Sequence, residues 1–260
     1  IDQLWVASRL VRFLRQQELE NPAFIKGEIL VVPAVNPYSF NMGKTFWPMD
    51  NTDIDAMFPG YNKGETTQRI AAKLFEKINH FEYAVLLEAR KDRVECIPYV
   101  KVLRTGYEDV NEAQAFGLEF IHYKDPTPSD TVSLGYNWQI WNAKSFSIIS
   151  GKKGTLRKIE STKVFDALIR FLAKKGIIEY SAFEGAVGNI ITSEDMEVVK
   201  SSSAGLFDAL APIGEHVVHG QPLARIYNAL DGSLLQTIIS PCEGIISCKY
   251  DYPLIFQNAV

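Results

Sequence analysis

The alternation of short apolar runs with amphipathic segments is the pattern that most restricts the fold of residues 1–185. Wholly apolar, β-branched runs are typical of strands buried on both faces of a sheet. The segment 27–35 (GEILVVPAV) is read as such a run, and 83–89 (YAVLLEA), 96–103 (CIPYVKVL) and 145–150 (SFSIIS) are predicted as further buried strands. Apolar residues at helical spacing predict packed helices at 1–19, 66–79 and from Ser161, the expected N-cap, to the stop at Gly176. The order of these elements predicts an α/β fold with helices on both faces of the sheet.

The pattern changes after about residue 185. From there on, short strand-like runs are separated by Gly and Pro, and no helical period of useful length appears. We therefore predict two domains: an α/β domain at 1–185 and a small all-β domain at 186–260. The chain begins at Ile1, without Met and inside a helical pattern, so an N-terminal part of the α/β domain is expected upstream.

Charge and hydropathy exclude two classes of partner. The 260 residues include 27 Lys and Arg against 31 Asp and Glu, which gives a formal net charge of −4. A surface that binds nucleic acid needs clustered basic residues, so no nucleic-acid partner is expected. No apolar run reaches the roughly 18 residues of a membrane-spanning helix, so no membrane association is expected either. We predict a cytoplasmic protein that forms, at most, homo-oligomers.

The cysteines and the paired histidines give weak signals. Cys96, Cys242 and Cys248 are too few for a disulfide framework or a four-cysteine zinc site. Cys242 and Cys248 flank a turn, but a reducing compartment favours two free thiols. A spacing of three on an extended strand points His216 and His219 to opposite faces, which favours two exposed edge residues over a shared metal.

Residues 36–60 hold an ordered series of motifs: NPYSF at 36–40, then Lys44, then PMDNTDIDAMFPG at 48–60. The series resembles the succinylglutamate desuccinylase/aspartoacylase family, whose pattern runs N-P-x-x-F, an Arg, and D-x-x-D-L-N-R-x-F-P-G. The likeness extends over nearly the whole chain. It implies a zinc-carboxypeptidase-like mixed sheet flanked by helices, followed by a small β-barrel or sandwich domain. It also implies a zinc-dependent hydrolase that cleaves the linear amide C–N bond of N-acyl amino acids.

The residues that the family uses for chemistry are largely replaced here. The family's H-x-x-E zinc ligands would lie upstream of Ile1. Glu88 stands where the family has the third ligand, the His of D-L-H, and a carboxylate can bind zinc. Ile149 stands where the family has the Glu of E-x-G, the general base and acid, and an aliphatic side chain cannot accept a proton. By this resemblance the chain has no catalytic residue, Glu88 is its one candidate metal ligand, and the substitutions argue against bound zinc.

The carboxylate-binding residues of the family are replaced as well. Asp55 stands at the Asn of the family's Asn-Arg pair, and Lys44 at the preceding Arg, which gives a point donor in place of a bidentate fork. We expect a pocket for a small-molecule ligand, more acidic than that of the family, in which Lys44, Asp53, Asp55 and Arg104 bind the ligand.

Two functions follow from the resemblance. In the first, the chain is a catalytically degenerate member that keeps the scaffold and binds a small molecule. In the second, it is an active zinc hydrolase that uses H-x-x-E residues upstream of Ile1, Glu88 as third ligand, and a base that the sequence does not identify. Stoichiometric zinc together with deacylase turnover would distinguish the second function from the first.

Overall fold

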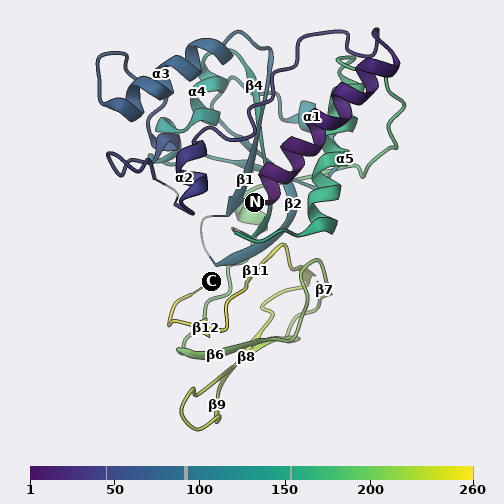
Figure 1. The fold of residues 1–260 in the computed structure, drawn as a ribbon. Helices are drawn as coiled ribbons and strands as arrows, with labels where there is room; N and C mark the ends of the chain where they lie inside the picture. Colours follow the sequence, from purple (N-terminus) through teal and green to yellow (C-terminus); the bar gives the residue numbers. More distant parts are fainter. Residues whose placement is uncertain (45, 91–92, 153, 260) are drawn as a thin grey trace.

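A six-stranded mixed sheet forms the centre of the molecule, which is described here from a computed structural model of residues 1–44, 46–90, 93–152 and 154–259 (Figure 1). Five strands lie in the order β1-β4-β2-β3-β5, and the sixth, β11, pairs with β2. Their bounds are β1 Tyr83–Arg90, β2 Val94–Leu103, β3 Phe120–Lys124, β4 Lys144–Lys152, β5 Asn189–Ile191 and β11 Cys248–Tyr250. β1 and β4 are parallel, β2 is antiparallel to β4, and β3 and β5 continue parallel to β2. The predicted α/β class and mixed sheet are confirmed.

Helices cover both faces of this sheet. Helices α1 (Asp2–Glu20) and α5 (Lys158–Lys174) pack side by side on one face, and α3 (Thr66–Ile78) and α4 (Leu134–Ile140) lie on the other (Figure 1). The amphipathic spacing explains this division, because the apolar stripe of each helix is buried against the apolar strands. In the part of the chain that the structure describes, short 3-10 segments complete the connections at Ile54–Ala56, Val110–Phe116, Asp130–Val132 and Ser193–Asp195. Within the described residues, no helix is long and apolar enough to cross a membrane.

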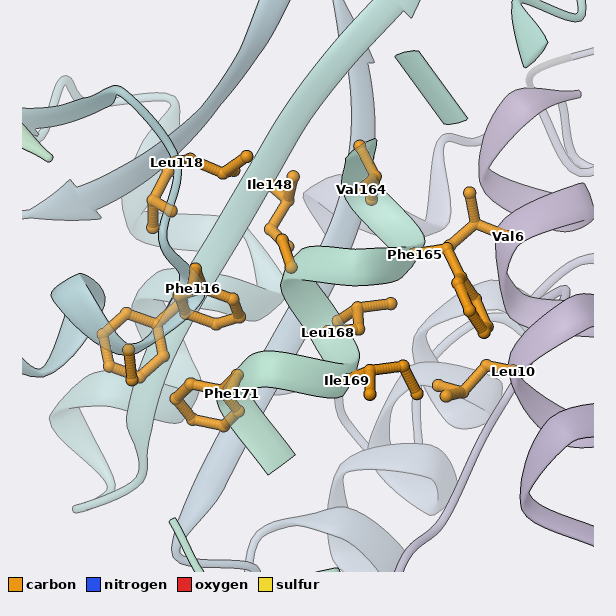
Figure 2. Packing of buried hydrophobic residues seen from close by; sticks show 14 of the residues in the cluster. Val6, Leu10, Phe116, Leu118, Ile148, Val164, Phe165, Leu168, Ile169 and Phe171 are labelled. Atoms are coloured by element: carbon orange, nitrogen blue, oxygen red, sulfur yellow. The ribbon is translucent and has the colours of Figure 1, made fainter. Parts of the chain in front are cut away.

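The main core lies between the sheet and the α1/α5 layer (Figure 2). Ile148 of β4 and Leu168 of α5 are buried there beside Leu10 of α1. The rings of Phe116 and Phe171 stack with their centroids 4.3 Å apart. Burial of large aliphatic and aromatic side chains stabilises the fold by about 1.5–3 kcal/mol for each side chain, so this cluster anchors α1 and α5 to the sheet.

The start of α5 differs from the sequence-based expectation. Ser161 was expected as the N-cap, but α5 begins at Lys158, with Arg157 as the N-cap residue. The cap is supplied instead by Asp2, a residue far away in sequence. Its buried carboxylate accepts hydrogen bonds from the Arg157 backbone amide (2.6 Å) and from the Ser161 hydroxyl (3.0 Å). The predicted stop is confirmed, since Gly176 follows the helix with a positive φ of 67°.

The apolar segment at residues 28–35 is not a strand, which corrects the sequence-based expectation. It runs along the sheet without regular pairing, and no backbone hydrogen bond joins it to any other described residue. A strand needs a neighbour for its backbone groups, and no described strand pairs with this segment. The short helix α2 (Pro37–Asn41) follows it.

The C-terminal part of the chain forms two small antiparallel sheets, as predicted for an all-β module. One contains β12, β6, β8 and β9, and the other β10 and β7. Their bounds are β6 Gly205–Ala209, β7 His216–Val217, β8 Pro222–Tyr227, β9 Leu234–Ile239, β10 Gly244–Ile245 and β12 Leu254–Ile255. The domain boundary at 185/186 remains a prediction. Strands β5 and β11 both lie beyond it in sequence, and both belong to the six-stranded sheet.

The expectation of free thiols at Cys242 and Cys248 is wrong for the second residue. Cys248 of β11 forms a disulfide with Cys96 of β2, its direct partner in the antiparallel pair. Cys242 is free and exposed. The sequence could not show this pairing, because the two half-cystines are 152 residues apart and meet only when β11 joins the central sheet.

Candidate functional site

Two rows of side chains cross the sheet on the face that α3 and α4 cover. Directly paired residues place Glu88, Ile149 and Tyr99 in one row, across β1, β4 and β2. This face is identified by Leu86 of β1, which packs with the α3/α4 cluster, because residues two apart on a strand share a face. Glu88 therefore faces the same side as Leu86.

The second row runs through Leu86, Ser147, Lys101 and His122, on β1, β4, β2 and β3. Ser147 lies beneath α4: a side chain on Gly135 would come within 3.7 Å of its hydroxyl oxygen. The two rows are two residues apart on each strand, so their side chains are neighbours. Together the two rows bring several polar side chains onto this face near the carboxyl ends of β1 and β4.

An ion pair joins the two rows. The ammonium nitrogen of Lys101 lies 3.4 Å from Oε1 and 3.2 Å from Oε2 of Glu88, which puts it within reach of both carboxylate oxygens. Lys101 is on β2 and Glu88 is on β1, so the lysine side chain extends across β4 between them. Its side chain is 18% exposed and that of Glu88 33%. Glu88 therefore already has a cationic partner from within the chain.

Ile149 lies directly between Glu88 and Tyr99 in the first row and is buried. It provides no group that can accept or donate a proton. The position that the resemblance assigns to a general base is therefore on the same face as Glu88, and it holds an aliphatic side chain.

His122 lies opposite Lys101 and was missed by the sequence analysis. Its Nε2 is buried and has no hydrogen-bond partner among the described residues. Burial lowers the pKa of His122, and the positive charges of Lys124, Arg90 and Lys101 lower it further. The imidazole is therefore neutral at neutral pH, and its surroundings on this face are cationic.

The predicted acidic character of the pocket stays a prediction, but around Glu88 itself the structure places a positive charge. Lys101 neutralises the one carboxylate of the two rows, and Arg90 adds a further positive charge near His122. Lys101 could have been noticed from the sequence, since it is a charged residue inside an apolar strand pattern. Only the sheet order, however, brings it next to Glu88.

The predicted ligand-binding residues of the 44–55 segment lie on the same side of the sheet. Ile54, between Asp53 and Asp55, is buried in the cluster that contains Leu86. The carboxylate of Asp53 accepts the backbone amide of Asp55 (3.1 Å) and so caps the short 3-10 segment. Lys44 is exposed in the turn after α2. The role of Lys44, Asp53 and Asp55 as ligand contacts remains a prediction.

Arg104 is not brought to this site. It follows β2, which runs antiparallel to β1 and β4, so it lies toward the amino ends of those strands while Glu88 lies toward their carboxyl ends. There it pairs with Asp125 (3.4 Å) and stacks over the Tyr123 ring (4.5 Å to the centroid). The direction of β2, which local sequence patterns do not encode, decides this placement.

The described residues do not by themselves fit a zinc ion. No three His, Cys, Asp or Glu side chains of the described ranges lie close enough together to hold a metal. The one residue that the resemblance proposes as a ligand, Glu88, is paired with a lysine, and a cation beside a carboxylate competes with a metal for it.

Solved structures with the same architecture identify the fold. A succinylglutamate desuccinylase/aspartoacylase from Rhodobacter sphaeroides matches 99% of this chain and 79% of its own, with TM-score 0.77 and 19% identity. An aspartoacylase family protein from Mesorhizobium loti matches 100% and 79%, with TM-score 0.76 and 17% identity. The chain has the succinylglutamate desuccinylase/aspartoacylase fold. The resemblance seen in the sequence motifs is thereby confirmed at the level of the fold.

A third structure extends this desuccinylase/aspartoacylase comparison. The product-bound ectoine utilization protein from Ruegeria pomeroyi covers 90% of this chain and 73% of its own, with TM-score 0.72 and 19% identity. No family model and no curated protein sequence matches the chain. At identities below 20% these likenesses concern the fold, and the function has to be argued from the site.

Proposed function

We propose that the chain is a non-hydrolytic protein with the desuccinylase/aspartoacylase fold, and that it binds a small molecule at the Glu88–Lys101 pair. The observation that carries the proposal is this ion pair, which spans β4 at the position where the resemblance places a zinc ligand. Ile149 lies beside this pair, at the position that the resemblance assigns to the general base, and its aliphatic side chain cannot transfer a proton.

The charges of the site suggest the class of ligand. Glu88 and Lys101 present one negative and one positive group, both partly exposed. A ligand with an ammonium group and a carboxylate matches such a pair, because each of its charges finds an opposite charge. A free α-amino acid is a small molecule of this kind. An N-acyl amino acid lacks the cationic group and matches the site less well.

Calorimetric titration with matched ligands tests the proposal. A panel of free α-amino acids would be compared with the N-acetyl form of each, so that each pair differs in the cationic group. We expect at least one free amino acid to bind, and its N-acetyl form to bind tenfold or more weakly. Lys101→Met and Glu88→Gln should each reduce the affinity at least tenfold. Lys144→Met removes another partly buried lysine, paired with Glu112 away from the site, and serves as the matched control.

A hydrolysis assay in the presence of added zinc is the measurement that could contradict the proposal. If an N-acyl amino acid is cleaved with turnover that Glu88→Gln abolishes, the chain is a hydrolase and the proposal fails. Preferential binding of the N-acetyl forms would overturn it as well.

The second candidate function is the active zinc hydrolase. The observation that favours it is His122, a neutral imidazole with an unpartnered nitrogen on the same face as Glu88. Neutral imidazole is a good metal ligand and proton acceptor. This function also needs ligands upstream of Ile1 and release of Glu88 from Lys101, so the ion pair weighs against it.

A further inference from the structure

A groove of about 430 Å³ lies between α1 and α5, on the face of the sheet opposite the Glu88–Lys101 pair. Its floor is apolar, since Phe165 and Ile169 of α5 are buried and point toward α1 (Figure 2). Phe13 of α1 packs edge-on against Phe165, with the ring centroids 5.8 Å apart. Small ligands occupy protein cavities of roughly 300–1,000 Å³. The groove is therefore large enough for a small molecule.

The charged side chains around this floor are mostly basic. Among the described residues that line the groove, Arg9 and Arg12 come from α1, and Asp166 and Arg170 from α5. Burial lowers the pKa of Arg170, while the negative charge of Asp166, one turn earlier on α5, raises it. Three guanidinium groups against one carboxylate leave two positive charges without compensation from the lining.

Contacts with uncharged groups hold two of these guanidinium groups in place. Arg170 donates from Nη1 to the Gly117 carbonyl oxygen (3.1 Å). Arg9 donates to the Thr162 hydroxyl (3.3 Å), and its guanidinium lies over the Phe165 ring, 4.0 Å from the centroid. These partners position the side chains and leave their charge unpaired. Groups that are already fixed lose little side-chain entropy when an anion binds.

The chain that follows α5 adds an aromatic wall to the groove. The Glu179 and Ala186 backbone amides are hydrogen-bonded to other parts of the chain, which fixes this segment at both ends. Tyr180 packs edge-on against Phe13, with the centroids 5.4 Å apart. Phe183 lines the groove and is 92% exposed. Its ring therefore offers a free face on which a planar ligand ring can stack.

We propose that the groove binds a planar aromatic molecule that carries a phosphate group, such as a nucleoside monophosphate. A phosphate monoester carries a charge of about −1.5 to −2 at neutral pH, which matches the two uncompensated positive charges. Guanidinium groups bind phosphate oxygens through two parallel hydrogen bonds, and an aromatic side chain such as Phe183 stacks on a base. A single carboxylate would leave one of the positive charges uncompensated. The groove shares no residue with the Glu88–Lys101 pair, so this proposal does not depend on the proposed function.

Calorimetric titration with each nucleotide and with its two parts tests the proposal. The 260-residue chain would be titrated with AMP, GMP, CMP and UMP, with the four nucleosides, and with inorganic phosphate. We expect at least one nucleotide to bind tenfold or more tightly than both its nucleoside and inorganic phosphate. The proposal is overturned if none of the nucleotides binds. It is also overturned if phosphate alone, or the nucleoside alone, binds as tightly as the nucleotide.

Variants of the groove show where the nucleotide lies. Arg12 is exposed and forms no ion pair within the described ranges, and Phe183 is almost fully exposed, so Arg12→Gln and Phe183→Ala should both fold normally. Each should weaken nucleotide binding about tenfold. Arg15→Gln changes an exposed arginine of α1 outside the groove, and Val187→Ala shortens an apolar side chain that is 88% exposed after α5. Both controls should bind the nucleotide like the unchanged chain.

The same titrations distinguish the groove from the Glu88–Lys101 site. Binding that Lys101→Met removes and Arg12→Gln leaves intact would place the nucleotide at the other site and overturn the proposal. Equal losses in Arg12→Gln and Arg15→Gln would also overturn it, because the nucleotide would then respond to the general positive charge of α1 and not to the groove.

Discussion

At the scale of single residues, the chemistry of the site depends on which charged side chains are paired with an opposite charge. Lys101 compensates Glu88 across β4, and the neutral His122 lies in a cationic environment. A similar compensation occurs at the other end of the sheet. The carboxylate of Glu108 accepts hydrogen bonds from the Tyr123 hydroxyl and from the backbone amides of Thr105 (2.9 Å) and Gly106 (2.7 Å).

These contacts predict a pH dependence of stability. Burial raises the pKa of Glu108, but the hydrogen bonds outweigh it and lower the pKa from 4.5 to about 2. Because the folded state binds this proton less tightly than the unfolded state, Glu108 stabilises the fold above about pH 4.5, and the contribution is lost as the pH falls toward 2. Glu108→Gln should reduce the fall of the unfolding free energy over this range by about 1 kcal/mol, because solvent screens a partly exposed carboxylate.

Urea unfolding measured at several pH values checks this expectation. Tyr123→Phe removes one donor and should shift the same loss of stability to higher pH without abolishing it. An unchanged slope in Glu108→Gln would show that the hydrogen-bonded carboxylate is not the cause; Asp130, whose pKa is also about 2, would then be examined first.

At the scale of elements, distant parts of the chain complete one another. The N-terminus of α5 is capped by Asp2, in the first turn of α1, so the helix start that sequence rules placed at Ser161 is decided by a tertiary contact. The positions and types of elements were predicted well where the apolar pattern was strong, as in helix α3 and strand β1. The segment 28–35 was predicted as a strand and is not one, since strand formation requires a neighbour as well as a suitable sequence.

Asp2→Ala should lower the free energy of unfolding by about 2 kcal/mol, because it leaves the Arg157 amide and the Ser161 hydroxyl without their buried acceptor. Asp2→Asn keeps a side-chain oxygen and should cost less than half as much. Chemical denaturation of the two variants measures the difference. Equal losses in both would mean that the charge, and not the hydrogen-bond acceptor, is what α5 requires.

At the scale of the whole molecule, the C-terminal segment is tied back to the central sheet. β11 pairs with β2, and the Cys96–Cys248 disulfide makes that pairing covalent over 152 residues. Disulfides are rare in reducing compartments, so this bond does not support the predicted cytoplasmic location, which remains a prediction.

The disulfide has a direct measurable consequence. Thiol titration of the unfolded, unreduced chain should find one free thiol, that of Cys242. Cys248→Ser should lower the unfolding free energy by roughly 2–5 kcal/mol, since it releases a long loop in the unfolded state. Cys242→Ser is the control and should leave stability unchanged. Three titratable thiols in the wild-type chain would contradict the pairing.

The sequence by itself determined the layered α/β class, the small β module, the resemblance to the desuccinylase/aspartoacylase fold, and the presence of an aliphatic residue at position 149. These follow from local periodicity and ordered motifs, which are properties of neighbouring residues. Tertiary structure alone decided that Lys101 meets Glu88, that Arg104 lies at the opposite end of the sheet, and that Cys96 bonds Cys248. The physical reason is that strand order and direction set these contacts, and both arise from long-range pairing that local sequence patterns do not encode.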